Sequence, residues 1–284
     1  MKNKIASIFF YLFASFGFLS LIITFYLNFF LIEESKDSQD IKNYENYTPL
    51  FVYSGEQYDK KLSKVDDISK IVEIIKQNHN IALTNNLDFL IAVDDFLRQK
   101  YFHQTAYSDI STNWILRIID IIFPEYHFST SMDPYELVQK NHGLCNQQSI
   151  VFQEIIKKYG YEYASVGFSI SEGSDYFDHF ASAAKVNDEW YYFDSNIEPK
   201  FDRRDPSVIG KIIDGDRKFI SSIYPNFYIP PIKEGDILFK DLNQFPAKNG
   251  LLFQKLTQFL SNFIWVLLFL LAIISNFFRS RNLD

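Results

Sequence analysis

The sequence predicts an α+β domain held between two membrane-spanning helices. Three observations lead to this prediction: a long uncharged segment near each end of the chain, helical spacing of apolar residues in the first half of the region between them, and strand-like alternation after that. The 284 residues include 28 Lys and Arg against 35 Asp and Glu. This acidic balance disfavours nucleic acid as a partner, because nucleic-acid binding needs clustered positive charge.

Both uncharged segments are long enough to cross a bilayer. Residues 5–32 and 256–278 contain no Asp, Glu, Lys or Arg, and a hydrocarbon core of about 30 Å needs roughly 20 apolar residues. We therefore expect a transmembrane helix at each position. A cleaved signal peptide is the alternative for the first segment, but its apolar region would be only about 7–15 residues long, with a small-residue cleavage site after it.

The charges beside these segments predict that both ends of the chain are cytoplasmic. Lys2 and Lys4 precede the first segment and acidic residues follow it, whereas Arg279 and Arg281 follow the second segment. Basic residues favour the cytoplasmic side of a membrane. The region between the segments is then expected outside the cytoplasm.

An external domain is expected at residues 59–250, after a polar tether at residues 33–58. Apolar residues recur with helical spacing in the first part of this domain. Pro124 and Gly160 are the expected stops of two of these helices. The predicted helices begin near Val65 and then cover residues 85–104, residues 111–123, a short turn after Asp133-Pro134, and residues 144–159.

The period changes from helical to alternating after Gly160, which predicts antiparallel strands. The strands are expected at residues 161–170, 177–186 and 190–194. Residues 202–247 contain several prolines, so this segment is predicted to consist mostly of loops with short elements.

The second and third strands are predicted to form a hairpin that turns at Asn187-Asp188. A two-residue loop there pairs Val186 with Glu189 and places His179 and Asp194 on one face as diagonal neighbours, close enough for an imidazole to meet a carboxylate. A three-residue loop would move Asp194 to the other face.

Cys145 is the single cysteine of the chain and lies at a predicted helix start. Unpaired N–H groups and the helix dipole favour a thiolate there. It is either a buried packing residue or a thiol kept for chemistry. The chemical alternative needs a base, and among five histidines His179 lies in a strand where Asp194 could orient it. His142 is expected to cap or line the turn before the cysteine.

The residues around these three positions resemble the transglutaminase-like superfamily. The stretches 133–137, 142–145 and 155–160 resemble its cysteine block, and Asp178-His179-Phe180 followed by residues 190–194 resembles its His and Asp blocks. The resemblance covers about residues 87–199. It implies a papain-like core in which helices come first and an antiparallel sheet follows.

The resemblance also implies roles for named residues. Cys145 would be the nucleophile, His179 the base and then the general acid, and Asp194 the group that holds the imidazole. The backbone N–H of Cys145 would bind the oxyanion, with Gln139 as a candidate side-chain donor. The alternative for Gln139 is a solvated helix residue.

The resemblance implies acyl-transfer chemistry on a protein or peptide-like amide, through a thioester that passes to water or to an amine, with hydrolysis preferred. Phe180, Ala181 and Ser195 depart from the residues common in the family, so the walls of the cleft are expected to differ. The alternative is a catalytically silent module in a membrane or envelope assembly. A small transport subunit is a further reading, but neither apolar segment holds an ionisable Asp, Glu, Lys, Arg or His to mark a pathway.

No metal or cofactor is expected. The sequence contains no HExxH motif, no ligand spacing typical of an EF-hand and no glycine-rich phosphate loop. The acidic turns at residues 202–205 and 214–216 are interpreted as solvated turns.

Overall fold

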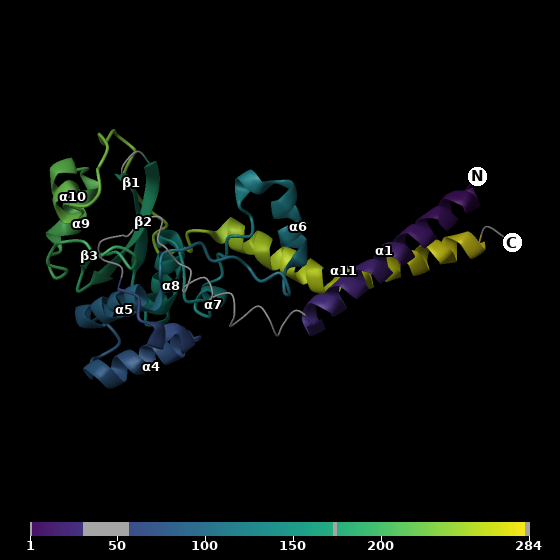
Figure 1. Ribbon diagram of the computed structural model, residues 1–284, viewed down its shortest axis with the longest axis horizontal. Helices are drawn as coiled ribbons and strands as arrows, with labels where there is room; N and C mark the ends of the chain where they lie inside the picture. Colours follow the sequence, from purple (N-terminus) through teal and green to yellow (C-terminus); the bar gives the residue numbers. More distant parts are fainter. Residues whose placement is uncertain (1, 31–56, 173–174, 282–284) are drawn as a thin grey trace. The chain divides into compact units, whose positions relative to one another are not determined.

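The computed structural model describes residues 2–30, 57–172 and 175–281, and the chain divides into two compact units. One unit contains Met1–Glu45, Tyr107–Thr130 and Asn249–Asp284, and the other contains Asn46–Ala106 and Ser131–Lys248. The second unit is an α+β fold, as predicted (Figure 1). Most of the tether predicted at residues 33–58 lies outside the described residues.

The helices of the α+β unit begin at polar residues that accept from the first turn. Asp67 and Asn86 each accept a hydrogen bond from the backbone two residues ahead, which caps two helix starts. Asn80 ends one helix in the left-handed conformation, with φ of 47°. The elements are η1 (Lys60–Lys64), α4 (Ile68–His79), α5 (Leu87–Lys100), α7 (Pro134–Leu137) and α8 (Cys145–Lys158).

The sheet has four antiparallel strands in the order β3-β2-β1-β4. The hairpin prediction is confirmed, since Val186 pairs with Glu189, and Asn187 and Asp188 have the positive φ values of a two-residue turn. β3 ends one residue before Asp194, which was predicted as its last residue. The strands are β1 (Tyr163–Glu172), β2 (Asp175–Val186), β3 (Glu189–Phe193) and β4 (Leu238–Lys240), and the sequence did not predict β4.

Each face of this sheet has its own apolar core. Even-numbered residues of β2, such as Ala184 and Val186, pack with α4, α5 and α8. Odd-numbered residues, such as Ala181 and Ala183, pack with α9 (Ser207–Ile213) and α10 (Arg217–Ile223). These two short helices lie in the proline-interrupted segment. The α9 and α10 side is therefore the face to which His179 belongs.

The other unit is built on two long apolar helices that run antiparallel. They are α1 (Lys2–Phe30) and α11 (Lys248–Arg281), and the unit also contains α6 (Trp114–Ile122) and η2 (Pro124–Tyr126). Thr24 Oγ1 donates to the Ser261 carbonyl at 2.9 Å. A Cβ added to Gly17 would lie 3.3 Å from that of Leu268, so glycine permits the close approach of the two helices. The first residue of α1 and the last residue of α11 lie at the same end of this hairpin (Figure 1).

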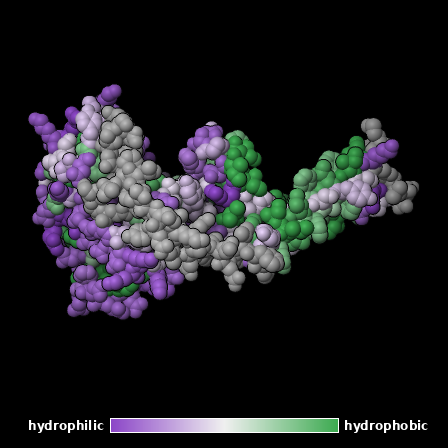
Figure 2. Space-filling view, in the orientation of Figure 1, coloured by the Kyte–Doolittle hydropathy of each residue, from purple (hydrophilic) through white to green (hydrophobic). Residues whose placement is uncertain are grey.

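α1 and α11 are candidate membrane-spanning helices by length, composition and exposure. Lys4–Asn28 and Lys248–Ser280 are long and apolar enough to span a bilayer, and only 11% and 17% of their most apolar windows are buried. A core helix of a soluble protein would be mostly buried. Figure 2 shows the continuous hydrophobic surface of the hairpin. These features are consistent with a two-pass membrane protein.

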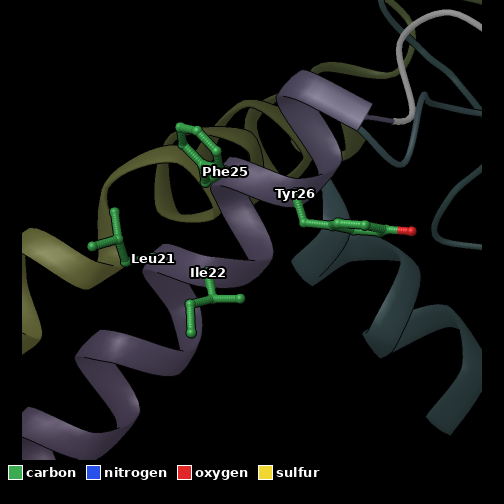
Figure 3. A pocket seen from close by; sticks show the side chains of 4 residues that line it. All are labelled: Leu21, Ile22, Phe25 and Tyr26. Atoms are coloured by element: carbon green, nitrogen blue, oxygen red, sulfur yellow. The ribbon is translucent and has the colours of Figure 1, made fainter.

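A recess on this hairpin is lined by side chains of α1 alone: Leu21, Ile22, Phe25 and Tyr26 (Figure 3). No acidic, basic or thiol group lines it. The recess therefore lacks the groups of a catalytic centre, and the candidate site must be sought in the α+β unit.

Candidate active site

Two glutamines fix the first turn of α8, where Cys145 is the first residue. Gln147 Oε1 accepts from the backbone N–H of Leu144 at 3.1 Å, and Gln148 Nε2 donates to the Gly143 carbonyl at 2.8 Å. Gln147 also bonds to the backbone of the loops at residues 106 and 131. The start of α8 is thus tied to neighbouring loops, and Cys145 lies among the unpaired N–H groups of a helix N-terminus.

Two polar contacts between α8 and β2 determine which part of β2 lies beside Cys145. Gln153 donates to the hydroxyl of Ser182 at 3.0 Å, and Ser149 donates to the Phe180 carbonyl at 3.2 Å. Cys145, Ser149 and Gln153 are four residues apart, so they share one side of the helix. One further turn toward the N-terminus brings Cys145 level with the part of β2 that precedes Phe180.

His179 and Asp194 meet because β3 stops early. β3 ends at Phe193, opposite Ser182, so β2 has no β3 neighbour at His179 and the chain turns there. Nε2 of His179 lies 2.6 Å from Oδ2 of Asp194, and both side chains are buried. The predicted meeting of imidazole and carboxylate is confirmed, whereas their catalytic roles stay predictions.

The Asp194 carboxylate is fully used as an acceptor. Tyr224, which follows α10, donates its hydroxyl to Oδ2 at 2.6 Å. The other oxygen accepts from the backbone N–H groups of Asn196 and Ile197, at 3.0 Å each. A buried carboxylate with four donors is held in one orientation.

The protonation states of His179 and Asp194 depend on each other. Burial alone would lower the pKa of the His179 imidazole, but the Asp194 carboxylate and the Cys145 thiol favour the protonated ring, and the pKa rises well above its usual value. Burial would raise the pKa of the Asp194 carboxyl, but His179, Tyr224 and the N–H of Ile197 hold it below its usual value. The pair therefore favours an imidazolium beside a carboxylate.

Asp194 occupies Nε2 of His179, so Nδ1 is the ring nitrogen that remains available to the Cys145 thiol. Nδ1 of His179 is buried and has no hydrogen-bond partner in the described part of the chain, while the half-buried Cys145 is close enough to contribute to the pKa of the ring. Such contacts are often longer than a hydrogen bond before substrate binds. Within the described residues, Asp194 thus binds one nitrogen of the His179 ring and Cys145 lies near that ring.

A buried ionic network lies behind Asp194. Arg98 donates to the Asp194 carbonyl and to the Asp94 carboxylate, at 2.8 Å each. Asp94 also accepts from Ser195 at 2.9 Å and from Arg203 at 3.2 Å. Ser195, a departure from the resemblance, thus joins the turn after Asp194 to α5. This network fixes the backbone of the orienting residue.

Two further histidines lie near the site. His103 Nδ1 is 2.9 Å from Nδ2 of Asn196, and burial, followed by the charge of His179, lowers its pKa to about 4. His142 bonds to Asn141 through Nδ1 at 3.0 Å and packs on the ring of Phe102. His142 lines the turn before Cys145, as predicted.

Gln139 is exposed, on the turn that follows α7. This is the solvated position that the sequence left open for it, and its oxyanion role stays a prediction. Among the described residues, no group of three or more His, Cys, Asp or Glu could hold a metal ion.

No protein-family model, curated protein or solved structure matches this chain. The transglutaminase-like resemblance therefore remains a prediction from the sequence. What the structure adds is the contact between the His179 imidazole and the Asp194 carboxylate, with the Cys145 thiol close enough to raise the pKa of the ring.

Sequence reasoning missed three residues that shape this site. Tyr224 lies in the proline-interrupted segment, where no periodicity marks a buried position. Gln147 and His103 carry no local signal, because their partners lie far away in the sequence. Asn196 contacts His103 from the turn after Asp194.

Proposed function

We propose that this chain is a membrane-anchored cysteine enzyme of the transglutaminase-like type, which attacks an amide through a thioester at Cys145. The observation that carries the proposal is the 2.6 Å contact between Nε2 of His179 and Asp194. Because this contact occupies Nε2, the proton transfers to and from substrate fall to Nδ1, the nitrogen left for the thiol.

The proposed reaction has two halves. The Cys145 thiolate attacks the amide carbonyl, and the Nδ1–H of the His179 imidazolium protonates the leaving amine as the carbon–nitrogen bond breaks. Water then attacks the thioester, Nδ1 takes its proton, and the carbon–sulfur bond breaks to return the thiolate. Asp194 stabilises the imidazolium in both halves without itself becoming protonated.

The oxyanion is assigned to the N-terminus of α8. The N–H of Cys145 is one of the unpaired donors of the first turn, and the helix dipole favours negative charge there. Gln139 is proposed as an additional donor that would have to turn inward when substrate binds.

Water is the proposed acceptor, with amine transfer as the alternative outcome. Cys145 is half-buried, so water can reach the thioester. The substrate class is a protein or peptide-like amide, on the non-cytoplasmic side of a membrane that α1 and α11 span with both termini in the cytoplasm.

A catalytically silent module in a membrane or envelope assembly is the second candidate. The observation that favours it is that Nδ1 of His179 makes no hydrogen bond of ordinary geometry within the described residues, although Cys145 lies close enough to raise the pKa of the ring. In that case Cys145 would be a packing residue and the domain a binding module.

An activated ester tests the two candidates without knowledge of the substrate. The full chain in detergent is mixed with p-nitrophenyl acetate, and nitrophenolate release and the mass of the Cys145 peptide are followed. The enzyme proposal predicts a burst of one nitrophenolate per chain with acetyl on Cys145, then turnover. Loss of general acid–base catalysis in His179→Ala should slow acetylation by about 10²–10⁴-fold.

The matched control is His79→Ala, because His79 is exposed at the end of α4 and should leave the rate unchanged. Glycinamide in the mixture separates the acceptors, since amine transfer would produce acetylglycinamide. Acetylation of Cys145 no faster than in His179→Ala would contradict the enzyme proposal and favour the silent module.

A further inference from the structure

One face of α6 is apolar and open to solvent. Ile118, Ile121 and Ile122 are exposed, Ile121 to 76%, and they lie three and four residues apart on one side of the helix. Phe123, the C-cap residue of α6, and Tyr126 of η2 are exposed as well. An exposed cluster of large apolar side chains marks a surface that contacts something other than water. We call these five residues the α6 apolar face.

The charged residues of α6 point elsewhere and are paired. Arg117 Nη1 lies 3.7 Å from the Asp120 carboxylate, and Ser129 joins the two, accepting from Arg117 at 2.7 Å and donating to Asp120 at 2.5 Å. Arg117 and Asp120 are therefore bound to each other and to Ser129, away from the three isoleucines. The remaining charge of the segment is the exposed Glu125 of η2, which must stay at the level of the lipid headgroups when the isoleucines enter the lipid. Such segregation is typical of helices that lie in a membrane interface.

α6 is attached to α11 at its first turn. Asn113 Nδ2 donates to the Gln254 carbonyl at 2.9 Å, and Trp114 Nε1 donates to the Ser261 carbonyl at 2.8 Å. The backbone N–H of Ile115 donates to the Ser261 hydroxyl at 3.0 Å. α6 is thus held to α11 within one compact unit.

The attachment point coincides with one boundary of the expected membrane. At a rise of 1.5 Å per residue, a hydrocarbon core of about 30 Å counted back from Arg279 ends roughly 20 residues earlier, near Phe259. Gln254 and Ser261 lie on either side of that position. Trp114 is also the residue type enriched at membrane interfaces. The start of α6 therefore lies at the level where lipid headgroups would be.

We propose that α6 and η2 form an interfacial segment whose apolar face inserts among the lipids beside the α1–α11 hairpin. Figure 2 shows that the hydrophobic side of this segment is turned toward the hydrophobic hairpin, with hydrophilic residues on its other side. The occupant of the face is thus the bilayer that the hairpin already enters. The inference extends the membrane contact and does not depend on catalysis at Cys145.

Depth measurements with a spin label test this proposal. The full chain carries Cys145→Ser, so that one introduced cysteine is the single thiol, and is reconstituted into vesicles of phosphatidylcholine and phosphatidylglycerol. A nitroxide is attached at Ile121→Cys, at Leu267→Cys in α11, or at Ile213→Cys. Ile213 is a matched control because it is an exposed isoleucine of the other unit. Collision rates with oxygen, which concentrates in lipid, and with a water-soluble nickel chelate are compared.

The proposal predicts that labels at 121 and 267 collide more with oxygen than with nickel, and that the label at 213 shows the reverse. A label at 121 that behaves like the one at 213 would overturn it. A label at 267 that collides more with nickel than with oxygen would also overturn the proposal, because α11 would then not lie in the bilayer. Shielding of 121 by a second copy would appear as short label-to-label distances that persist in detergent, and it would also overturn the proposal.

Discussion

Tyr224 donates its hydroxyl to the same oxygen of Asp194 that holds His179. Both contacts measure 2.6 Å, so one carboxylate oxygen joins an imidazole from β2 to a phenol that follows α10. The phenol hydroxyl lies 2.7 Å from that of Tyr192 in β3. The orientation of His179 therefore depends on a residue far from the candidate catalytic positions in the sequence.

Tyr224→Phe should lower both stability and thiol reactivity. Loss of a hydrogen bond to a charged group costs about 1.5–3 kcal/mol of unfolding free energy. Acetylation of Cys145 should slow by roughly tenfold, because Tyr224 acts through Asp194. Tyr192→Phe is the matched control, since its hydroxyl bonds to Tyr224 rather than to Asp194, and it should change the rate by less than about twofold. Equal effects of the two variants would contradict a role for Tyr224 in positioning Asp194.

Arg98→Met should destabilise the α+β unit severely. Removing the arginine leaves Asp94 with one cationic partner, and breaking a buried ion pair from one side costs about 3–5 kcal/mol. The control is Arg204→Met, because Arg204 pairs with Asp88 at the surface, where a pair is worth about 0–1 kcal/mol. Urea unfolding followed by tryptophan fluorescence gives both values. Similar midpoints for the two variants would show that the network does not stabilise this unit.

His103 and His142 should make the protein unstable in mild acid. Burial is the foremost cause that lowers the pKa of both rings to about 4, against about 6.5 in an unfolded chain. The unfolded chain therefore takes up protons first, and stability falls as the pH drops from about 6.5 toward 4, by at most on the order of 3 kcal/mol for each ring.

Urea midpoints between pH 7 and 4.5 check this prediction. A His103→Gln and His142→Gln double variant should flatten the decline, whereas His79→Gln should not. Asp194 does not contribute to a decline in this pH range. Its carboxyl has a lowered pKa in the folded protein, so its stabilising effect is lost only as the pH falls below the pKa of about 4 that it has in the unfolded chain. A double variant with the slope of the wild type would contradict the assignment.

Reporter fusions should place the two ends of the chain and the α+β unit in opposite compartments. The flanking charges predict cytoplasmic termini, and the antiparallel packing of α1 and α11 puts both termini at one end of the hairpin. A reporter at residue 284 should be active in the cytoplasm, and one inserted after Gly235, in an exposed loop, should be active outside. A cytoplasmic signal from the Gly235 position would reverse the proposed topology.

The parts of the fold with local signals could be predicted from the sequence. The turn at Asn187-Asp188 was predictable because both residue types tolerate positive φ, and the small residues of β2 face the larger ones of β3. The start of α8 was predicted to within one residue, because Gly143 interrupts the chain before it and an apolar face recurs at Val151, Phe152 and Ile155. The hairpin register alone predicted that His179 and Asp194 share a face.

The parts without local signals could not be predicted. The polar side of α5 gives no indication that Arg98 is covered by the turn after Asp194, because the contact joins residues far apart in the sequence. β4 is a short, exposed edge strand without alternation. α6 was predicted as a helix, but which of its faces is covered depends on its attachment to α11.

The pH dependence of Cys145 alkylation tests the central claim most directly, because this is the single thiol of the chain. An ordinary thiol has a pKa of about 8.5, so its reaction with iodoacetamide accelerates steeply up to that pH. The proposed triad predicts fast labelling that is already near its plateau by about pH 7, with the midpoint moved upward in His179→Ala and by less in Asp194→Ala. A profile that is the same in wild type and His179→Ala, or labelling only after unfolding, would contradict the enzyme and leave a silent module.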